Sequence, residues 1–75
     1  MALPVEFTRE AMEDIDDLPR FARLLSRLAE AGRAACGQPD PLTREVLIDG
    51  QRVLYRLESE QIVVLSAEPV PRSLH

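Results

Sequence analysis

The stretch Glu45-Val-Leu-Ile-Asp-Gly-Gln-Arg-Val-Leu-Tyr-Arg-Leu-Glu58 decides the fold of this chain. Asp49-Gly50 is the preferred residue pair for a type I′ turn between two antiparallel strands, and apolar residues alternate with others on both sides of it. A second break near Ser59-Glu60 precedes another apolar run from Gln61 to Ala67. We therefore predict a three-stranded antiparallel meander over residues 44–67.

Side chains along a strand point alternately to the two faces of a sheet. With two-residue loops at both turns, we expect the helices to cover one face, the core face, which carries Val46, Ile48, Val53, Tyr55, Leu57, Ile62 and Val64. The opposite face is called the second sheet face below. It is too apolar to be simply solvated, so we expect it to bind a protein partner. Its residues are Leu47, Arg52, Leu54, Arg56, Val63 and Leu65.

The residues before the meander predict one short strand and two helices. Apolar residues at every second position predict a strand over residues 1–8. Thr8 is a good N-cap, and apolar residues then recur at helical spacing as far as Gly37, with a break at Leu18-Pro19. Residues 9–37 are thus predicted as two helices, and residues 68–75, which contain two prolines, as a tail.

The predicted order is β-α-α-β-β-β. It corresponds to a single α+β domain over residues 1–75, with two helices packed on one face of an antiparallel sheet. A domain of 75 residues buries a small core and often needs a further source of stability. With a lone cysteine, Cys36, and a lone histidine, His75, neither an intrachain disulfide nor a zinc site is expected. We expect no cofactor or metal, and self-association into a homo-oligomer or a protein partner instead.

The charge and composition limit the possible partners. The net charge is −4, and all nine basic residues are arginines. Because phosphate neutralisation dominates nucleic-acid affinity, an acidic chain is a poor general nucleic-acid binder, and an aromatic content of 4% argues against a base-stacking platform. The apolar runs are far too short to cross a membrane. We expect a cytoplasmic protein without membrane contact.

Three segments resemble the RelE/ParE toxin superfamily of bacterial toxin–antitoxin systems. Val5-Glu-Phe-Thr-Arg-Glu-Ala-Met-Glu-Asp-Ile-Asp-Asp-Leu-Pro19 is similar to that family's first strand and helix. Gly50-Gln-Arg-Val-Leu-Tyr-Arg56 is similar to its Gly-x-x-Arg-Val-x-Tyr hairpin, one residue shorter, and Ile62-Val-Val-Leu65 to its last core strand. The resemblance implies the fold predicted above and an antitoxin or a target protein as partner, in a bacterium or a phage.

The chain departs from the RNA-cleaving members of that family. Those members are strongly basic, hold phosphates with Arg and Lys, and carry a basic segment after the last strand. Here only Arg52 falls on a matching position, and Ser66-Ala-Glu-Pro-Val-Pro-Arg72 follows the last strand. ParE-type members bind DNA gyrase and need no nuclease site, and this mode fits an acidic chain better.

Other candidate residues have simpler interpretations. Tyr55 falls on the core face, where packing is favoured over catalysis. Cys36 lies near a helix C-terminus, which does not activate a thiol, and His75 is terminal. Solvated helix faces are the default for the two charged clusters. These are Arg20, Arg23 and Arg27, and Glu13, Asp14, Asp16 and Asp17.

The sequence contains no nucleophile–base pair, phosphate loop or metal cluster. Our first hypothesis is therefore a small non-enzymatic protein on a RelE/ParE-like scaffold. It would dock on a protein target, as a gyrase-type toxin or as an inhibitor encoded by a mobile element. One alternative is a ribosome-dependent mRNA endonuclease that uses Arg52, Arg56 and Arg72. RNA is a partner only under this hypothesis. Another is a self-associating structural module.

Overall fold

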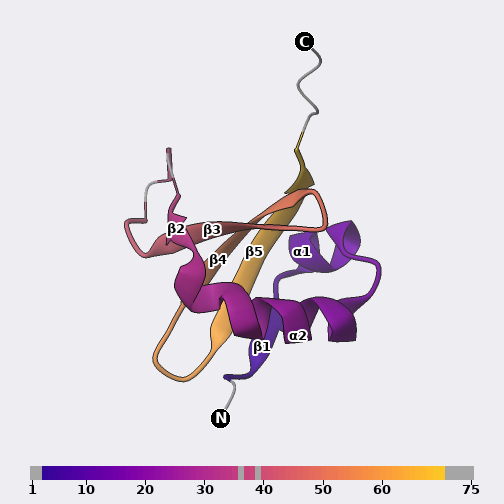
Figure 1. Cartoon of the computed structure of the whole chain (residues 1–75), viewed down its shortest axis with the longest axis horizontal. Coiled ribbons are helices and arrows are strands. Elements are labelled where there is room, and N and C mark those ends of the chain that lie inside the picture. Colours follow the sequence, from indigo (N-terminus) through magenta and orange to yellow (C-terminus); the bar gives the residue numbers. More distant parts are fainter. Residues whose placement is uncertain (1–2, 36, 39, 71–75) are drawn as a thin grey trace.

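The structure, a computed structural model, describes residues 3–35, 37–38 and 40–70. Two helices pack on a five-stranded sheet of order β1-β5-β4-β3-β2 (Figure 1). The predicted α+β class, the helix pair and the meander are confirmed. The elements are β1 (Val5–Phe7), α1 (Arg9–Asp14), α2 (Leu18–Leu28), a 3-10 turn η1 (Ala29–Ala31), β2 (Arg33–Ala34), β3 (Thr43–Ile48), β4 (Gln51–Leu57) and β5 (Ile62–Pro69).

Strands β2 to β5 pair antiparallel, as predicted for the meander, but the pairing of the first strand makes the sheet as a whole mixed. β1 pairs with β5 in parallel, with Val5 opposite Ile62 and Phe7 opposite Val64. Ile62 N–H donates to Pro4 O at 2.9 Å, which continues the ladder by one bond. The whole helical segment lies between β1 and the meander, and such a long crossover allows a parallel pairing. The local sequence pattern does not specify this direction.

The second helix is shorter than predicted. It ends at Leu28, one 3-10 turn follows, and the chain then forms the short strand β2 beside β3 instead of continuing as a helix to Gly37. Gly32 has an extended backbone (φ −66°, ψ 156°) at the point where the helical segment ends. Tertiary contacts of this kind override helix propensity, which is a weak preference. β5 also runs to Pro69, two residues beyond the predicted strand.

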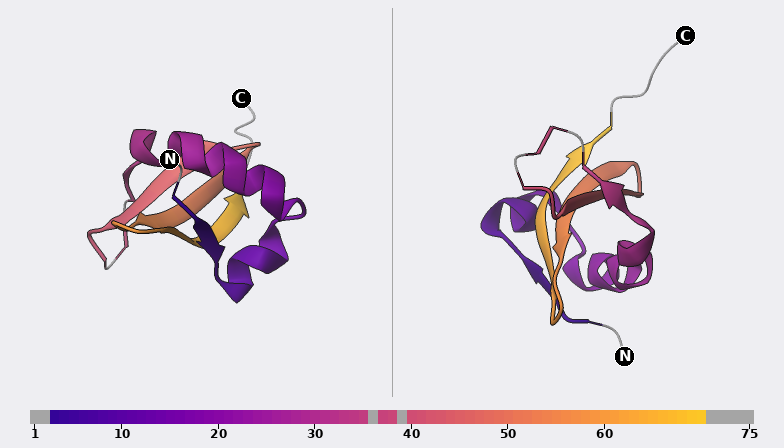
Figure 2. Two further views of the ribbon diagram at one scale, coloured as in Figure 1. Left: turned by 90° about the horizontal axis from the view of Figure 1, so that it is seen from below. Right: turned by 90° about the vertical axis from the view of Figure 1, so that its left-hand side faces the viewer.

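The core lies between the helices and the sheet. All seven residues predicted for the core face are buried in the core cluster or packed against it. α1 contributes Ala11, Ile15 follows directly after it, and α2 contributes Phe21 and Leu25. The Phe7 and Phe21 rings meet at 6.2 Å between centroids in a tilted arrangement, a favourable aromatic geometry. Figure 2 shows the twisted sheet with α2 running along it.

A β-bulge changes the alternation in β5. Tyr55 is opposite Val64 and Leu54 is opposite Ser66, so Leu65 has no partner in the register. Beyond this extra residue the alternation is shifted by one, and Ala67 joins the core with 1% of its surface exposed. Strict alternation from Ile62 to Ala67 does not predict this.

Caps and turns follow the local chemistry. Thr8 Oγ1 accepts from Ala11 N–H at 3.2 Å and donates to Leu65 O at 2.8 Å, which ties the start of α1 to the bulge. Asp17 caps α2 by accepting from Arg20 N–H at 3.2 Å. Asp49 (φ 52°) and Gly50 (φ 77°) both have positive φ, as the predicted type I′ turn requires.

Candidate functional site

The second sheet face carries more charge than the apolar residues alone suggest. Cross-strand register places Leu47, Arg52 and Glu68 in one row, and Glu45, Leu54 and Ser66 in the next. A third row contains Thr43, Arg56 and Val63. Acidic and hydroxyl groups therefore lie directly beside the predicted apolar residues and arginines.

Both arginines of this face contact carboxylates. Arg52 Nε donates to Glu45 Oε2, and these two side chains are 33% and 19% exposed. Arg56 Nε lies 3.3 Å from Asp40 Oδ2 and 3.9 Å from Glu58 Oε2, which are ion-pair distances, although the contacts are not aligned as hydrogen bonds. Each guanidinium group thus has a carboxylate neighbour within the chain.

The apolar residues of the face differ greatly in exposure. Leu54 is 8% exposed although it lies outside the core cluster, and the stems of Arg52 and Arg56 flank it along β4, as amphipathic side chains often do. Val63 and Leu65 are half-buried. Leu47 is 63% exposed, so it is the predicted partner-binding residue with the largest open apolar surface.

Leu47 belongs to a hollow of about 220 Å³, which we call the Leu47 hollow. Val70, 43% exposed, lines it from the other side. The hollow also includes Arg33. The sequence pattern placed Arg33 in a helix and Val70 in the tail. Only the long-range register brings these residues to Leu47. The lining residues are Arg33, Glu45, Val46, Leu47, Arg52 and Val70.

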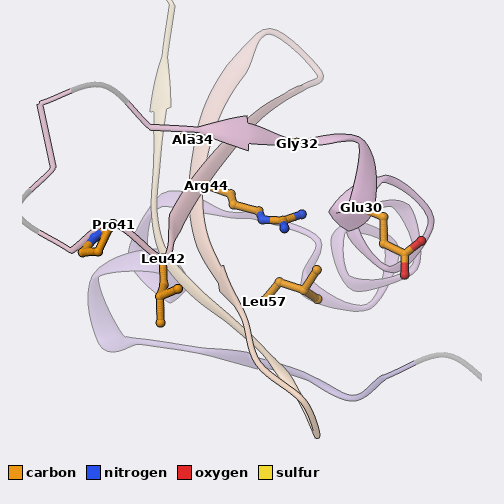
Figure 3. Close-up of a pocket in the computed structure, with 7 residues that line it drawn as sticks. All are labelled: Glu30, Gly32, Ala34, Pro41, Leu42, Arg44 and Leu57. Carbon is orange, nitrogen blue, oxygen red and sulfur yellow. The ribbon is translucent and has the colours of Figure 1, made fainter.

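A second hollow, of about 380 Å³, which we call the Arg44 hollow, lies where the helical segment ends. Arg44 extends into it and Glu30 lines the opposite wall (Figure 3). Arg44 Nη1 is 3.5 Å from Ala29 O, the carbonyl that also accepts the Tyr55 hydroxyl. A cation at a helix C-terminus stabilises the helix dipole, so Arg44 has a structural role here.

Tyr55 is fully buried, as its place on the core face predicts. Its hydroxyl donates to Ala29 O at the end of the helical segment. Burial raises the pKa of the phenol, and the nearby Arg44 partly opposes this rise. These contacts give Tyr55 a packing role.

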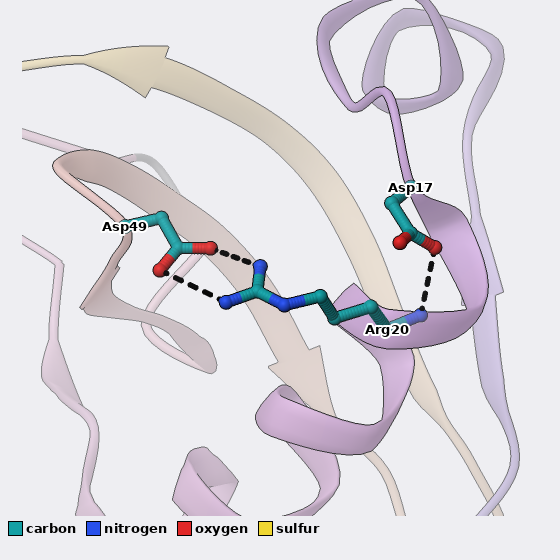
Figure 4. A network of polar contacts seen from close by, with 3 residues as sticks. All are labelled: Asp17, Arg20 and Asp49. Atoms are coloured by element: carbon teal, nitrogen blue, oxygen red, sulfur yellow. Dashed lines mark hydrogen bonds and ion pairs between the residues drawn. The ribbon is translucent and has the colours of Figure 1, made fainter.

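The two charged helix clusters lie in solvent. Arg20 lies in the N-terminal turn of α2, which Asp17 caps, and it pairs with Asp49 of the β3–β4 turn (Figure 4). Arg23 and Arg27 are exposed, and so are the acidic residues of the first helix and the turn after it. Among the described residues, no three His, Cys, Asp or Glu side chains gather as metal ligands would.

Three candidate residues, Cys36, Arg72 and His75, lie outside the described residues. The arginine triad of the nuclease alternative is therefore placed for Arg52 and Arg56 only. Within residues 3–35, 37–38 and 40–70, no helix is long and apolar enough to span a membrane.

The architecture is that of the RelE/ParE-like toxin fold. One similar solved structure is the toxin–antitoxin complex RelBE2 from Mycobacterium tuberculosis, with a TM-score of 0.67 and 21% identity, covering 93% of this chain and 100% of that one. Another is the chromosomal ParDE toxin–antitoxin system from P. aeruginosa, with a TM-score of 0.64 and 16% identity, covering 93% and 98%. No protein-family model matches the sequence, and no curated protein matches it significantly.

Proposed function

We propose that this chain is a non-enzymatic binding protein on a toxin scaffold, which acts by docking its second sheet face on another protein. The similar structures come from toxin–antitoxin complexes, so an antitoxin or a cellular target such as DNA gyrase is the partner class. An inhibitor encoded by a mobile element would use the same surface.

The observation that supports this proposal is that both arginines of the second sheet face already contact carboxylates. A nuclease would need Arg52 and Arg56 to hold phosphate, and each lies against a carboxylate of the same chain. The acidic neighbours would repel a phosphate backbone, whereas the open Leu47 on the same face is suited to apolar contact with a protein.

Two variants with equal exposure test this function. Leu47 and Leu42 are both 63% exposed, but Leu47 lies on the second sheet face and Leu42 lines the Arg44 hollow. The tagged chain, Leu47→Glu and Leu42→Glu would each be used to capture protein and RNA from bacterial lysate, with mass spectrometry and RNA sequencing. Purified gyrase would be tested separately in a supercoiling assay.

We expect a protein bound by the original chain and by Leu42→Glu but lost with Leu47→Glu. Recovery of ribosomes with cleaved mRNA would instead support the endonuclease alternative and overturn the proposal. A concentration-dependent dimer that Leu47→Glu dissolves, with no other protein captured, would support the self-associating module.

A further inference from the structure

An open sheet edge lies beside the Leu47 hollow. β2 covers only part of β3, because their register stops at Arg33 opposite Glu45. Ala35 N–H donates to Thr43 O at 3.0 Å, so the odd-numbered residues of β3 direct their backbone groups away from β4. Within the described part of the chain, the outward N–H and C=O of Leu47 therefore have no strand partner.

Leu47 thus combines two features of a peptide-binding edge. Its backbone offers one donor and one acceptor, and its side chain lies open in the apolar hollow that Val70 shares. Natural sheets protect such edges with charged residues, proline or a covering element. The edge residues Val46, Leu47 and Ile48 carry neither charge nor proline.

The open edge has a cation, Arg33, at one end and the carboxylate of Asp49 at the other. Arg33 is opposite Glu45 and so points to the second sheet face at the rim of the hollow. It is exposed, and no carboxylate of the described residues lies within ion-pair distance of it. An added strand would continue the line of β2 and bring its nearer end to Arg33.

We propose that the edge of β3 at Leu47 binds a short extended segment of a partner protein by strand addition. The segment places an apolar side chain in the Leu47 hollow and a carboxylate beside Arg33. This inference rests on the proposed function, because it specifies how the second sheet face engages its protein partner.

A second copy of this chain fits the edge less well. Two β3 strands paired antiparallel about Leu47 would place Glu45 of one copy opposite Asp49 of the other, and like charges directly opposite destabilise a strand pair. β2 also already occupies the edge at Glu45. A short segment of a different protein can end beside Arg33 before it overlaps β2, and it need carry no acidic residue opposite Asp49.

A small peptide tests the site directly. The end-blocked peptide Thr-Val-Thr-Glu, paired antiparallel to β3 with valine opposite Leu47, places valine and glutamate on one face of a strand. Its glutamate then lies at the end nearest Arg33, and no carboxylate lies opposite Asp49. Titrated into ¹⁵N-labelled protein, it should give saturable NMR shifts centred on the Leu47 amide and slow the hydrogen exchange of that amide. The same peptide with N-methylvaline lacks the central N–H and should bind at least tenfold more weakly, about the effect of a lost hydrogen bond.

Three variants separate the contributions. Arg33→Glu should weaken binding of the glutamate peptide by about tenfold and make the matched Thr-Val-Thr-Lys peptide the better ligand. Leu47→Pro removes the outward N–H without removing a bond to β4, so the chain should fold and lose peptide binding. Leu47→Val keeps the N–H and an apolar side chain and should retain binding.

Several results would overturn the proposal. They are shifts centred on α2 or the Arg44 hollow, equal binding of the N-methylated peptide, or shifts at Leu47 on simple dilution of the peptide-free protein, which would assign the edge to a second copy. The two proposals fail differently. A protein captured equally well by Leu47→Pro refutes the edge alone, whereas peptide binding without any protein target refutes the proposed function alone.

Discussion

Gly32 occupies a position where any larger residue would meet the ring of Tyr55. A Cβ atom there would lie 1.8 Å from the Tyr55 hydroxyl oxygen and 3.0 Å from Glu45 O. Its backbone has negative φ, so space and not conformation requires glycine. We predict that Gly32→Ala lowers the free energy of unfolding by roughly 1–3 kcal/mol through overpacking, as measured by chemical denaturation.

A double-mutant cycle with Tyr55→Phe is the control for this prediction. Removing the hydroxyl costs about 1 kcal/mol for its hydrogen bond to Ala29 O but relieves the closest clash. Gly32→Ala should therefore cost less in the Tyr55→Phe background than in the original chain. Equal costs in both backgrounds would show that the hydroxyl is not what excludes a side chain at position 32.

Ionisation of Tyr55 should lower the stability of the protein at alkaline pH. Burial raises its pKa above the ordinary value of 10.0, so the folded state favours the neutral phenol. Its contribution to stability is fully present below pH 10 and is lost as the pH rises toward and through the raised pKa. Because Tyr55 is the only tyrosine, ultraviolet absorbance reports its ionisation directly. We expect a titration midpoint above 10, and a stability loss on alkalinisation that Tyr55→Phe reduces.

At the scale of elements, Asp49 has two separable roles in the β3–β4 turn. Its positive φ suits the turn, and its carboxylate binds Arg20 of α2. The bond to Arg20 lowers the pKa of Asp49, so its contribution to stability is present above the ordinary pKa and is lost as the pH falls through the lowered value. Asp49→Asn keeps a residue that tolerates positive φ and should remove this acid dependence with little further loss of stability.

Asp49→Ala is the matched comparison. It removes the same ion pair but places a residue that disfavours positive φ in the turn. We expect Asp49→Ala to be less stable than Asp49→Asn at neutral pH in chemical denaturation. If the two variants are equally stable, the turn conformation does not depend on this residue.

The elements that depend on neighbouring residues were predictable, and those that depend on distant ones were not. Asp49-Gly50, the Thr8 cap and the break before Pro19 follow from local backbone chemistry. The parallel pairing of β1, the strand β2 and the bulge at Leu65 depend on partners far away in the sequence. The same limit applies to the site. Alternation placed Leu47 on the second sheet face, but only the folded register adds Arg33 and Val70.

For the whole molecule, stability should be highest in the middle of the sheet. β4 pairs with a strand on each side, and Val53 and Tyr55 are fully buried. Both residues of β2, by contrast, are exposed. We predict that native-state hydrogen exchange is slowest for backbone amides of β4 and fastest, among the strands, for those of β2. Equal protection of β2 and β4 would show that β2 belongs to the same cooperative unit.

The parallel pairing of β1 with β5 has a consequence for synthesis. β1 and both helices are synthesised before their partner strand, because Ile62 and Val64 are translated long after Val5 and Phe7. Until then the apolar faces of the nascent helices have no completed sheet to cover them. Productive folding must therefore wait for release of the last strand, and the unfinished chain is a substrate for chaperones and proteases during that interval.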